Sequence, residues 1–300
     1  MTTVTRDDLT AYLRRLGVAD PGSPSVEGLY ALARAHVERV PFENLDIQLG
    51  RPPGIDPALS VRRIAAGLGG YCFHLNGAFA ALLEGLGYEV TRHLGGMHTD
   101  PGALDAGGDH LALTVRVGGR ELFVDVGMGD GPYEPLPLRA GAYEQGFAYR
   151  LEAAAVTWGE GGSGGEGWSL LRDGVPTPRM NFRAAPAAMA DCEPAHRFLS
   201  TAEDSPFRQS LIMLRRGADG IDRLHGRMLI HTAVDGARTV RELTGAEEFH
   251  GAVTEVFGRT LDDVTREERA ALWDRVTRAH EAWRAAMAAS APAAAPAPAG

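Results

Sequence analysis

The stretch HLALTVRVGGRELFVDV occupies residues 110–126. Apolar residues alternate with others on both sides of Gly118-Gly119, which is typical of two strands joined by a two-residue type I′ turn. Such a turn fixes the register of the strands and places Arg116 opposite Glu121 as a cross-strand charge pair. The stretch therefore predicts an antiparallel sheet in the middle of the chain.

This register sorts the side chains of the hairpin onto two faces. One face is apolar throughout: Leu111, Leu113, Val115, Leu122, Val124 and Val126. The other face carries His110, with Asp125 as its diagonal neighbour. Diagonal partners lie about 7–8 Å apart at the backbone, so a carboxylate can reach an imidazole nitrogen. The hairpin predicts an Asp–His pair, and the alternative is a solvated strand face that bears two polar residues.

Helical periodicity dominates the chain before this hairpin. Apolar residues recur at spacings of three and four over 9–16, 26–37 and 72–86. The third helix begins in GGYCFHLNG, residues 69–77, so that Cys72 stands at its start. A thiol at a helix N-terminus, with an imidazole and a carboxylate, has what thiol catalysis requires. The alternative is a passive buried cysteine, since free cysteine is among the most buried residue types.

Strands and helices follow the hairpin in separate runs. Period-two patterns predict strands near 88–94, 147–153 and 168–173 and a second hairpin over 226–243. Helices are expected over 246–257 and 267–283, the last with a capping box at Thr265 and Glu268. GGSGG at 161–165 matches G-x-S-x-G, but it lies between two expected strands. We interpret it as a flexible loop in which Ser163 is not a nucleophile.

Composition excludes several classes of protein. The formal net charge of −9 over 300 residues opposes general binding to nucleic acid or to an anionic membrane. The first ten residues lack the basic and apolar regions of a signal peptide, so a cytoplasmic location is expected. Cys72 and Cys192 belong to no CxxC pair, so we expect neither a disulfide framework nor a metal site.

Five segments resemble successive signatures of the arylamine N-acetyltransferase family, in that family's order. They are RVPFENL (39–45), GGYCFHLNG (69–77), DHLALTV (109–115), FVDVGMGD (123–130) and STAEDSPF (200–207). The resemblance implies an α+β fold with a cysteine protease-like triad: Cys72 as nucleophile, His110 as general base and Asp125 as the residue that orients it. It also implies three parts, namely a helical bundle (1–90), an antiparallel β-barrel (91–198) and an α/β lid (199–285). The tail over 286–300 is rich in alanine and proline, and this composition predicts disorder.

The resemblance further implies a ping-pong acetyl transfer. Acetyl-CoA serves as donor substrate, with no tightly bound cofactor, and an aromatic amine, hydrazine or hydroxylamine accepts the acetyl group from the cysteine. A branch of the family instead closes a macrolactam through an aryl amine on a polyketide held by an acyl carrier protein, which is the main alternative. A hydrolase that uses the same triad and an accessory protein without chemistry are two further alternatives.

Six residues beside the triad segments are predicted to bind substrate or coenzyme A: Phe42, Tyr71, Phe73, Gly127, Met128 and Gly129. Gly127, Gly129 and Gly131 form a GxGxG run that either brings backbone N–H groups to a pyrophosphate or simply makes a tight turn. Met128 stands where the family commonly has phenylalanine, and a flexible thioether shapes a pocket less specifically for a small flat arylamine.

Two positions depart from the family's pattern. Leu68 stands where an arginine usually precedes the glycine pair, and His74 stands where a glutamate is usual. That arginine normally lies near the acid of the PFENL segment, which is Glu43 here. We expect His74, or a nearby arginine such as Arg39, to pair with Glu43 in its place.

Overall fold

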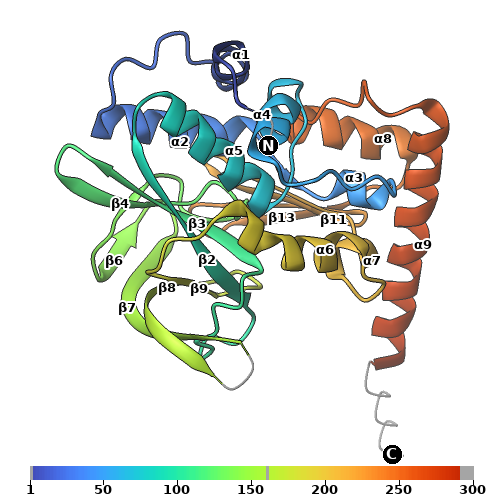
Figure 1. Ribbon diagram of the computed structural model, residues 1–300. Helices are drawn as coiled ribbons and strands as arrows, with labels where there is room; N and C mark the ends of the chain where they lie inside the picture. The colour runs from blue at the N-terminus through green and yellow to red at the C-terminus, as the bar shows by residue number, and fades with distance from the viewer. Residues whose placement is uncertain (1–2, 160–161, 291–300) are drawn as a thin grey trace, which may run out of the picture.

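A computed structural model describes residues 3–159 and 162–290, with the backbone alone for 286–290. Helices dominate the N-terminal part, as the periodicity predicts (Figure 1). They are α1 (Arg6–Leu16), α2 (Val26–Arg39), α3 (Leu45–Gln48), α4 (Pro57–Ala65) and α5 (Cys72–Gly85), with the short strand β1 (Phe42–Glu43) between α2 and α3. The sequence analysis missed α4, although Asp56 caps it and Pro57 occupies its first turn.

The middle of the chain forms an eight-stranded antiparallel sheet that curls into a nearly closed barrel (Figure 1). Its strand order is β5-β4-β3-β2-β9-β8-β7-β6. The bounds are β2 (Glu89–His98), β3 (His110–Val117), β4 (Arg120–Val124), β5 (Leu136–Pro137), β6 (Gly141–Glu144), β7 (Ala148–Trp158), β8 (Ser163–Arg172) and β9 (Arg179–Arg183). The α+β class and the antiparallel barrel expected from the sequence are confirmed.

The register of the β3–β4 hairpin is the one that its turn predicts. Arg116 lies opposite Glu121, and the two side chains approach to 4.0 Å. Gly118 and Gly119 have φ angles of 58° and 72°, the left-handed values that a type I′ turn requires. Both faces of the hairpin are buried, because the apolar face packs on the helices and the face with Phe123 fills the barrel. The alternative of a solvated strand face is therefore wrong.

The C-terminal part builds a second sheet, with strand order β1-β10-β11-β12-β13. Its elements are α6 (Glu193–Thr201), α7 (Pro206–Gln209), β10 (Ile212–Arg216), β11 (Gly220–His225), β12 (Met228–Ala233), β13 (Arg238–Glu242), α8 (Ala246–Gly251) and α9 (Arg266–Ser290). A 3-10 turn (Met189–Cys192) precedes α6, and a π-helical turn (Ala252–Val256) follows α8. Strand β1 comes from the N-terminal part and pairs Phe42 with Leu214, so this sheet joins the N-terminal and C-terminal parts of the chain.

Two segments differ from their expected structure. Ser163–Gly165 of the GGSGG stretch lie in β8, where they pair with Val156–Trp158 of β7, instead of in a loop. The expected tail starts at 286, but α9 continues to Ser290 because its alanines favour helix. Residues 291–300 of that tail lie outside the described residues.

His36 is a buried polar side chain in the core between the helices. Its ring lies edge-on to Tyr12 and Phe79, with centroids 5.9 Å and 5.2 Å away. Neither ring nitrogen finds a hydrogen-bond partner in the described part of the chain. Burial, assisted by the charge of Arg15, lowers the pKa of His36 to about 3. The folded protein therefore holds this imidazole neutral.

We expect His36 to make the fold sensitive to acid. The pKa of an exposed histidine is about 6.5, so the unfolded chain binds more protons than the folded chain between pH 6.5 and 3. The free energy of unfolding should therefore decrease as the pH falls through this window, by about 2 kcal/mol at pH 5 from this residue. Urea unfolding at pH 7.5 and pH 5 should show a smaller loss for His36→Phe than for the wild type. Equal losses would contradict this explanation.

Candidate active site

Cys72 is the first residue of α5, at the positive end of the helix dipole. The loop after β4 approaches this helix closely at Gly127. A Cβ atom there would lie 2.9 Å from Cys72 Cα and 2.7 Å from the side-chain amide nitrogen of Asn76. Only glycine lets the barrel and the helix meet at this distance, so Gly127 brings the His110 hairpin against the thiol.

His110 and Asp125 form the pair that the hairpin register predicts. His110 Nε2 lies 2.6 Å from Asp125 Oδ2, and both side chains are almost fully buried. The other oxygen, Oδ1, accepts hydrogen bonds from Asn76 Nδ2 at 2.9 Å and from the Gly127 N–H at 2.8 Å. Both oxygens of this buried carboxylate therefore have hydrogen-bond partners, from α5, β3 and the loop after β4.

The electrostatics of His110 involve both of its neighbours. Burial alone would lower its pKa. The charge of Asp125 and the hydrogen bond to it, with a hydrogen bond and a coulombic contribution from Cys72, outweigh burial and raise the pKa of His110 to about 10. Asp125 thus holds His110 through Nε2, and His110 borders the same cavity as Cys72, whose thiol lies 3.7 Å from the Asp109 carbonyl oxygen.

A cavity of about 280 Å³ opens beside Cys72 and His110. Its walls come from all three parts of the chain and are mostly apolar, including Phe42, Met128, Phe207 and Leu214. Of the six residues predicted to bind substrate or coenzyme A, Phe42, Gly127 and Met128 border this cavity. A cleft of this size and polarity suits a small organic ligand.

The other three predicted binding residues lie elsewhere. Phe73 is fully buried in a core cluster, and the Tyr71 hydroxyl lies 2.5 Å from His196 Nδ1. Gly129 packs against the Cβ atoms of Phe42 and Leu214. In the GxGxG run, the Gly127 N–H is already bonded to Asp125, which leaves it unable to bind a pyrophosphate.

Asn76 is a site residue that the sequence analysis missed. Its amide bonds Asp125 Oδ1 and the Leu111 carbonyl, and its Oδ1 accepts from the Val126 N–H at 2.9 Å. It thereby connects α5 to both strands of the hairpin. The signal was available, because Asn76 follows Cys72 by one helical turn and so shares its face of α5.

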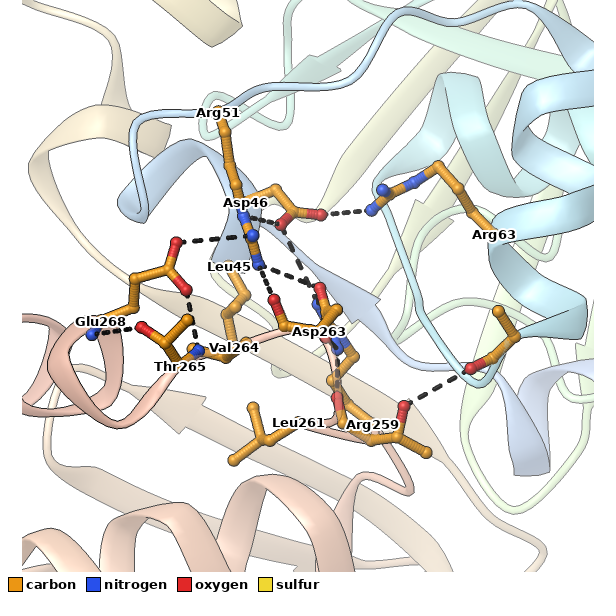
Figure 2. Close-up of polar contacts among 12 residues, drawn as sticks. Leu45, Asp46, Arg51, Arg63, Arg259, Leu261, Asp263, Val264, Thr265 and Glu268 are labelled. Carbon is orange, nitrogen blue, oxygen red and sulfur yellow. Dashed lines mark hydrogen bonds and ion pairs between the residues drawn. The ribbon is translucent and has the colours of Figure 1, made fainter.

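The hypothesis about Glu43 is wrong in its choice of partner. Arg259, far along the chain, places Nε 3.4 Å from Glu43 Oε1. Burial, with the charges of Arg63 and His196, lowers the pKa of His74 to about 3, so His74 is neutral at pH 7. Arg39 instead pairs with Glu38, at 3.6 Å. Figure 2 shows Arg259 within a cluster of alternating charges.

Within residues 3–159 and 162–290, no group of three or more histidine, cysteine, aspartate and glutamate side chains is placed to hold a metal ion. Over the same ranges, no helix combines the length and the apolar character needed to cross a bilayer.

Known proteins resemble this chain along most of its length. A family model described as N-acetyltransferase matches residues 25–266. The arylamine N-acetyltransferase of Mycolicibacterium smegmatis is 32% identical over 268 residues, which cover 86% of this chain and 94% of that protein. Proansamycin X synthase of Amycolatopsis mediterranei is 28% identical over 261 residues, covering 83% and 96%.

Solved structures of arylamine N-acetyltransferases share this fold. The structure of Mycobacterium marinum arylamine N-acetyltransferase in complex with CoA superposes with a TM-score of 0.78 at 26% identity, covering 90% of this chain and 99% of that one. The family resemblance drawn from the five sequence segments is confirmed by these matches. This chain belongs to the arylamine N-acetyltransferase family of enzymes.

Proposed function

We propose that this enzyme moves an acetyl group from acetyl-CoA, through a thioester on Cys72, to an aromatic amine or hydrazine. The observation that carries the proposal is the buried His110–Asp125 pair, which shares an apolar cavity of about 280 Å³ with the thiol of Cys72. Family membership supports the reaction class, and relatives named arylamine N-acetyltransferase support the acceptor.

His110 moves the protons in the first half-reaction. Because its pKa is raised, His110 already holds the proton that Cys72 gives up, and the thiolate attacks the carbonyl carbon of the acetyl thioester. The first N–H groups of α5 lack intrahelical partners and can stabilise the oxyanion that forms. As the intermediate collapses, the bond to the CoA sulfur breaks and His110 returns the proton to the leaving thiolate. One thioester has replaced another, so this step has little net free-energy change.

The second half-reaction uses the same groups in the reverse sense. The nitrogen of the amine attacks the Cys72 thioester, and His110 takes the proton that the nitrogen loses. Collapse breaks the carbon–sulfur bond, releases the amide and restores the thiolate of Cys72 beside protonated His110. Asp125 fixes the tautomer and orientation of His110 throughout. The apolar walls of the cavity disfavour water, which would otherwise hydrolyse the acetyl-enzyme.

A second, larger cavity supports the choice of a long thioester donor. It measures about 590 Å³ and shares Asp130, Pro176, Leu214 and Arg223 with the catalytic cavity. Ile221 and Ile230 give it an apolar wall on the C-terminal sheet, and Arg238 adds a second cation. A pantetheine arm would lie along this wall, with its phosphates near the two arginines.

The same cavity favours one alternative function. Together the two spaces exceed what an acetyl group and an arylamine fill, and pockets of about 300–1,000 Å³ hold drug-sized ligands. Proansamycin X synthase is among the relatives. In this alternative, the larger cavity holds the extended acyl chain of a carrier-bound polyketide, and an aryl amine within that chain attacks the thioester to close a macrolactam.

Intact mass spectrometry tests the acetyl-enzyme directly. After mixing with acetyl-CoA alone, the wild type should gain one acetyl group and Cys72→Ala should gain none. An arylamine should remove the acetyl group rapidly and yield the amide. Failure of the wild type to acetylate would reject acetyl-CoA as the donor. Equally fast loss without an amine would indicate a hydrolase.

A second prediction concerns what fills the larger cavity. Ile230→Trp should obstruct it and raise KM for acetyl-CoA about tenfold, with kcat little changed. The lost contact would bind the donor equally well in the ground state and in the transition state. Thr239→Trp is the matched control, since Thr239 is exposed on β13 but points to the opposite face from Arg238 and does not border the cavity. If Ile230→Trp instead spares acetyl-CoA and slows only octanoyl-CoA, the cavity holds the acyl chain and the amide synthase alternative is favoured.

A further inference from the structure

Two segments hold the turn that precedes Cys72. From one side, Glu43 Oε1 accepts a hydrogen bond from the Gly69 N–H at 3.2 Å, and the Glu43 N–H donates to the Gly70 carbonyl at 2.8 Å. From the other side, the Thr260 N–H donates to the Gly67 carbonyl at 3.1 Å. The turn over 67–71 is thus held between β1 and a segment from the C-terminal part.

A buried charge pair joins these two segments. The Glu43 side chain is only 2% exposed, and its nearest cation is Arg259, which is fully buried. The Arg259 guanidinium also bonds both oxygens of Asp263, at 2.7 Å and 3.1 Å, and lies 3.9 Å from Asp46 (Figure 2). A buried carboxylate is costly unless it is paired and hydrogen-bonded. Glu43 can therefore hold the turn in its charged form only while Arg259 remains in place.

We propose that Arg259 is a positioning residue, which fixes the turn over 67–71 through Glu43 and thereby sets the place of the Cys72 thiol relative to His110. The inference rests on the proposed role of Cys72 as nucleophile. If Arg259 has this role, the reactivity of Cys72 in the N-terminal helices depends on the docking of a segment from the C-terminal part.

The other charges near Glu43 do not replace Arg259. Arg63 bonds Asp46, and His74 on α5 is neutral, as described above. Burial raises the pKa of Glu43, with the Asp46 charge acting in the same direction, and Arg259 is the largest influence that lowers it. Without Arg259 the carboxyl group would take up a proton or leave the turn, and either change disturbs the bond to Gly69.

Arg51 offers a matched control within the same cluster. It is a cation that contacts Asp46 at 3.2 Å, Asp263 at 3.0 Å and Glu268 at 3.4 Å (Figure 2). Arg51 is 38% exposed and has no contact with Glu43 among the described residues. Arg51→Met therefore weakens the charge cluster without removing the cation of Glu43.

The experiment measures the rate of Cys72 alkylation by iodoacetamide, identified by peptide mass, beside kcat and KM. Arg259→Met should slow alkylation and lower kcat by about 10- to 100-fold, with KM changed less than about threefold, since misplacing a reacting atom affects chemistry more than binding. Arg51→Met should stay within about twofold of the wild type. Adding Glu43→Gln to Arg259→Met should restore part of the rate, because a neutral amide oxygen still accepts the Gly69 N–H and needs no cation, although the amide nitrogen cannot accept the Leu45 N–H that Glu43 Oε2 accepts.

Two results would overturn the inference: wild-type alkylation in Arg259→Met, or a double variant no faster than Arg259→Met. If Arg259→Met does not fold, Arg259→Lys takes its place in the same comparison. Lysine keeps the positive charge, but it lacks the planar guanidinium that contacts Glu43 and Asp263 at the same time. Alkylation requires no acyl donor. It therefore tests Arg259 even if the wild type transfers no acetyl group to an amine.

Discussion

The carboxylate of Asp125 is the group around which the site is organised. A buried carboxylate needs partners, and Asp125 takes them from separate elements: His110 at the start of β3, Asn76 on α5 and the Gly127 N–H in the loop after β4. These three bonds hold the helices and the barrel together at one point. Cys72 lies there because it shares a helix face with Asn76. The same contacts that satisfy a buried carboxylate therefore bring Cys72 and His110 to the wall of one cavity.

The C-terminal part completes this arrangement. Its sheet accepts β1 as an edge strand, and so brings Phe42 to the cavity and Glu43 beneath the turn before Cys72. The same sheet supplies Leu214 and Arg223 to the boundary between the two cavities. Arg259 then neutralises Glu43 from a distant part of the sequence. The position of Cys72, the shape of the cavity and the charge balance of Glu43 thus depend on one packing arrangement of three chain regions.

The features that depend on residues close together in the sequence were predicted best. A two-residue turn fixes the hairpin register, so the His110–Asp125 pair followed from the spacing of residues, and helical periodicity placed Cys72 at the start of α5. Contacts between distant segments were not predictable in the same way. The partner of Glu43 lies far along the chain, where nothing in its local pattern marks Arg259. Strand β1 has only two residues, which is too short to show the alternating pattern of a strand in the sequence. Phe73 was predicted to bind substrate, but its side chain is fully buried in the core.

The most direct test of this account is the titration of His110, followed by NMR of isotope-labelled histidine in the wild type and in Asp125→Asn. If the buried carboxylate governs the site, the wild-type imidazole stays protonated well above pH 7, in line with a pKa of about 10. In Asp125→Asn it should lose its proton at a much lower pH, because burial then acts without the opposing charge. A wild-type His110 that titrates near 6.5, or one unaffected by Asp125→Asn, would contradict the account.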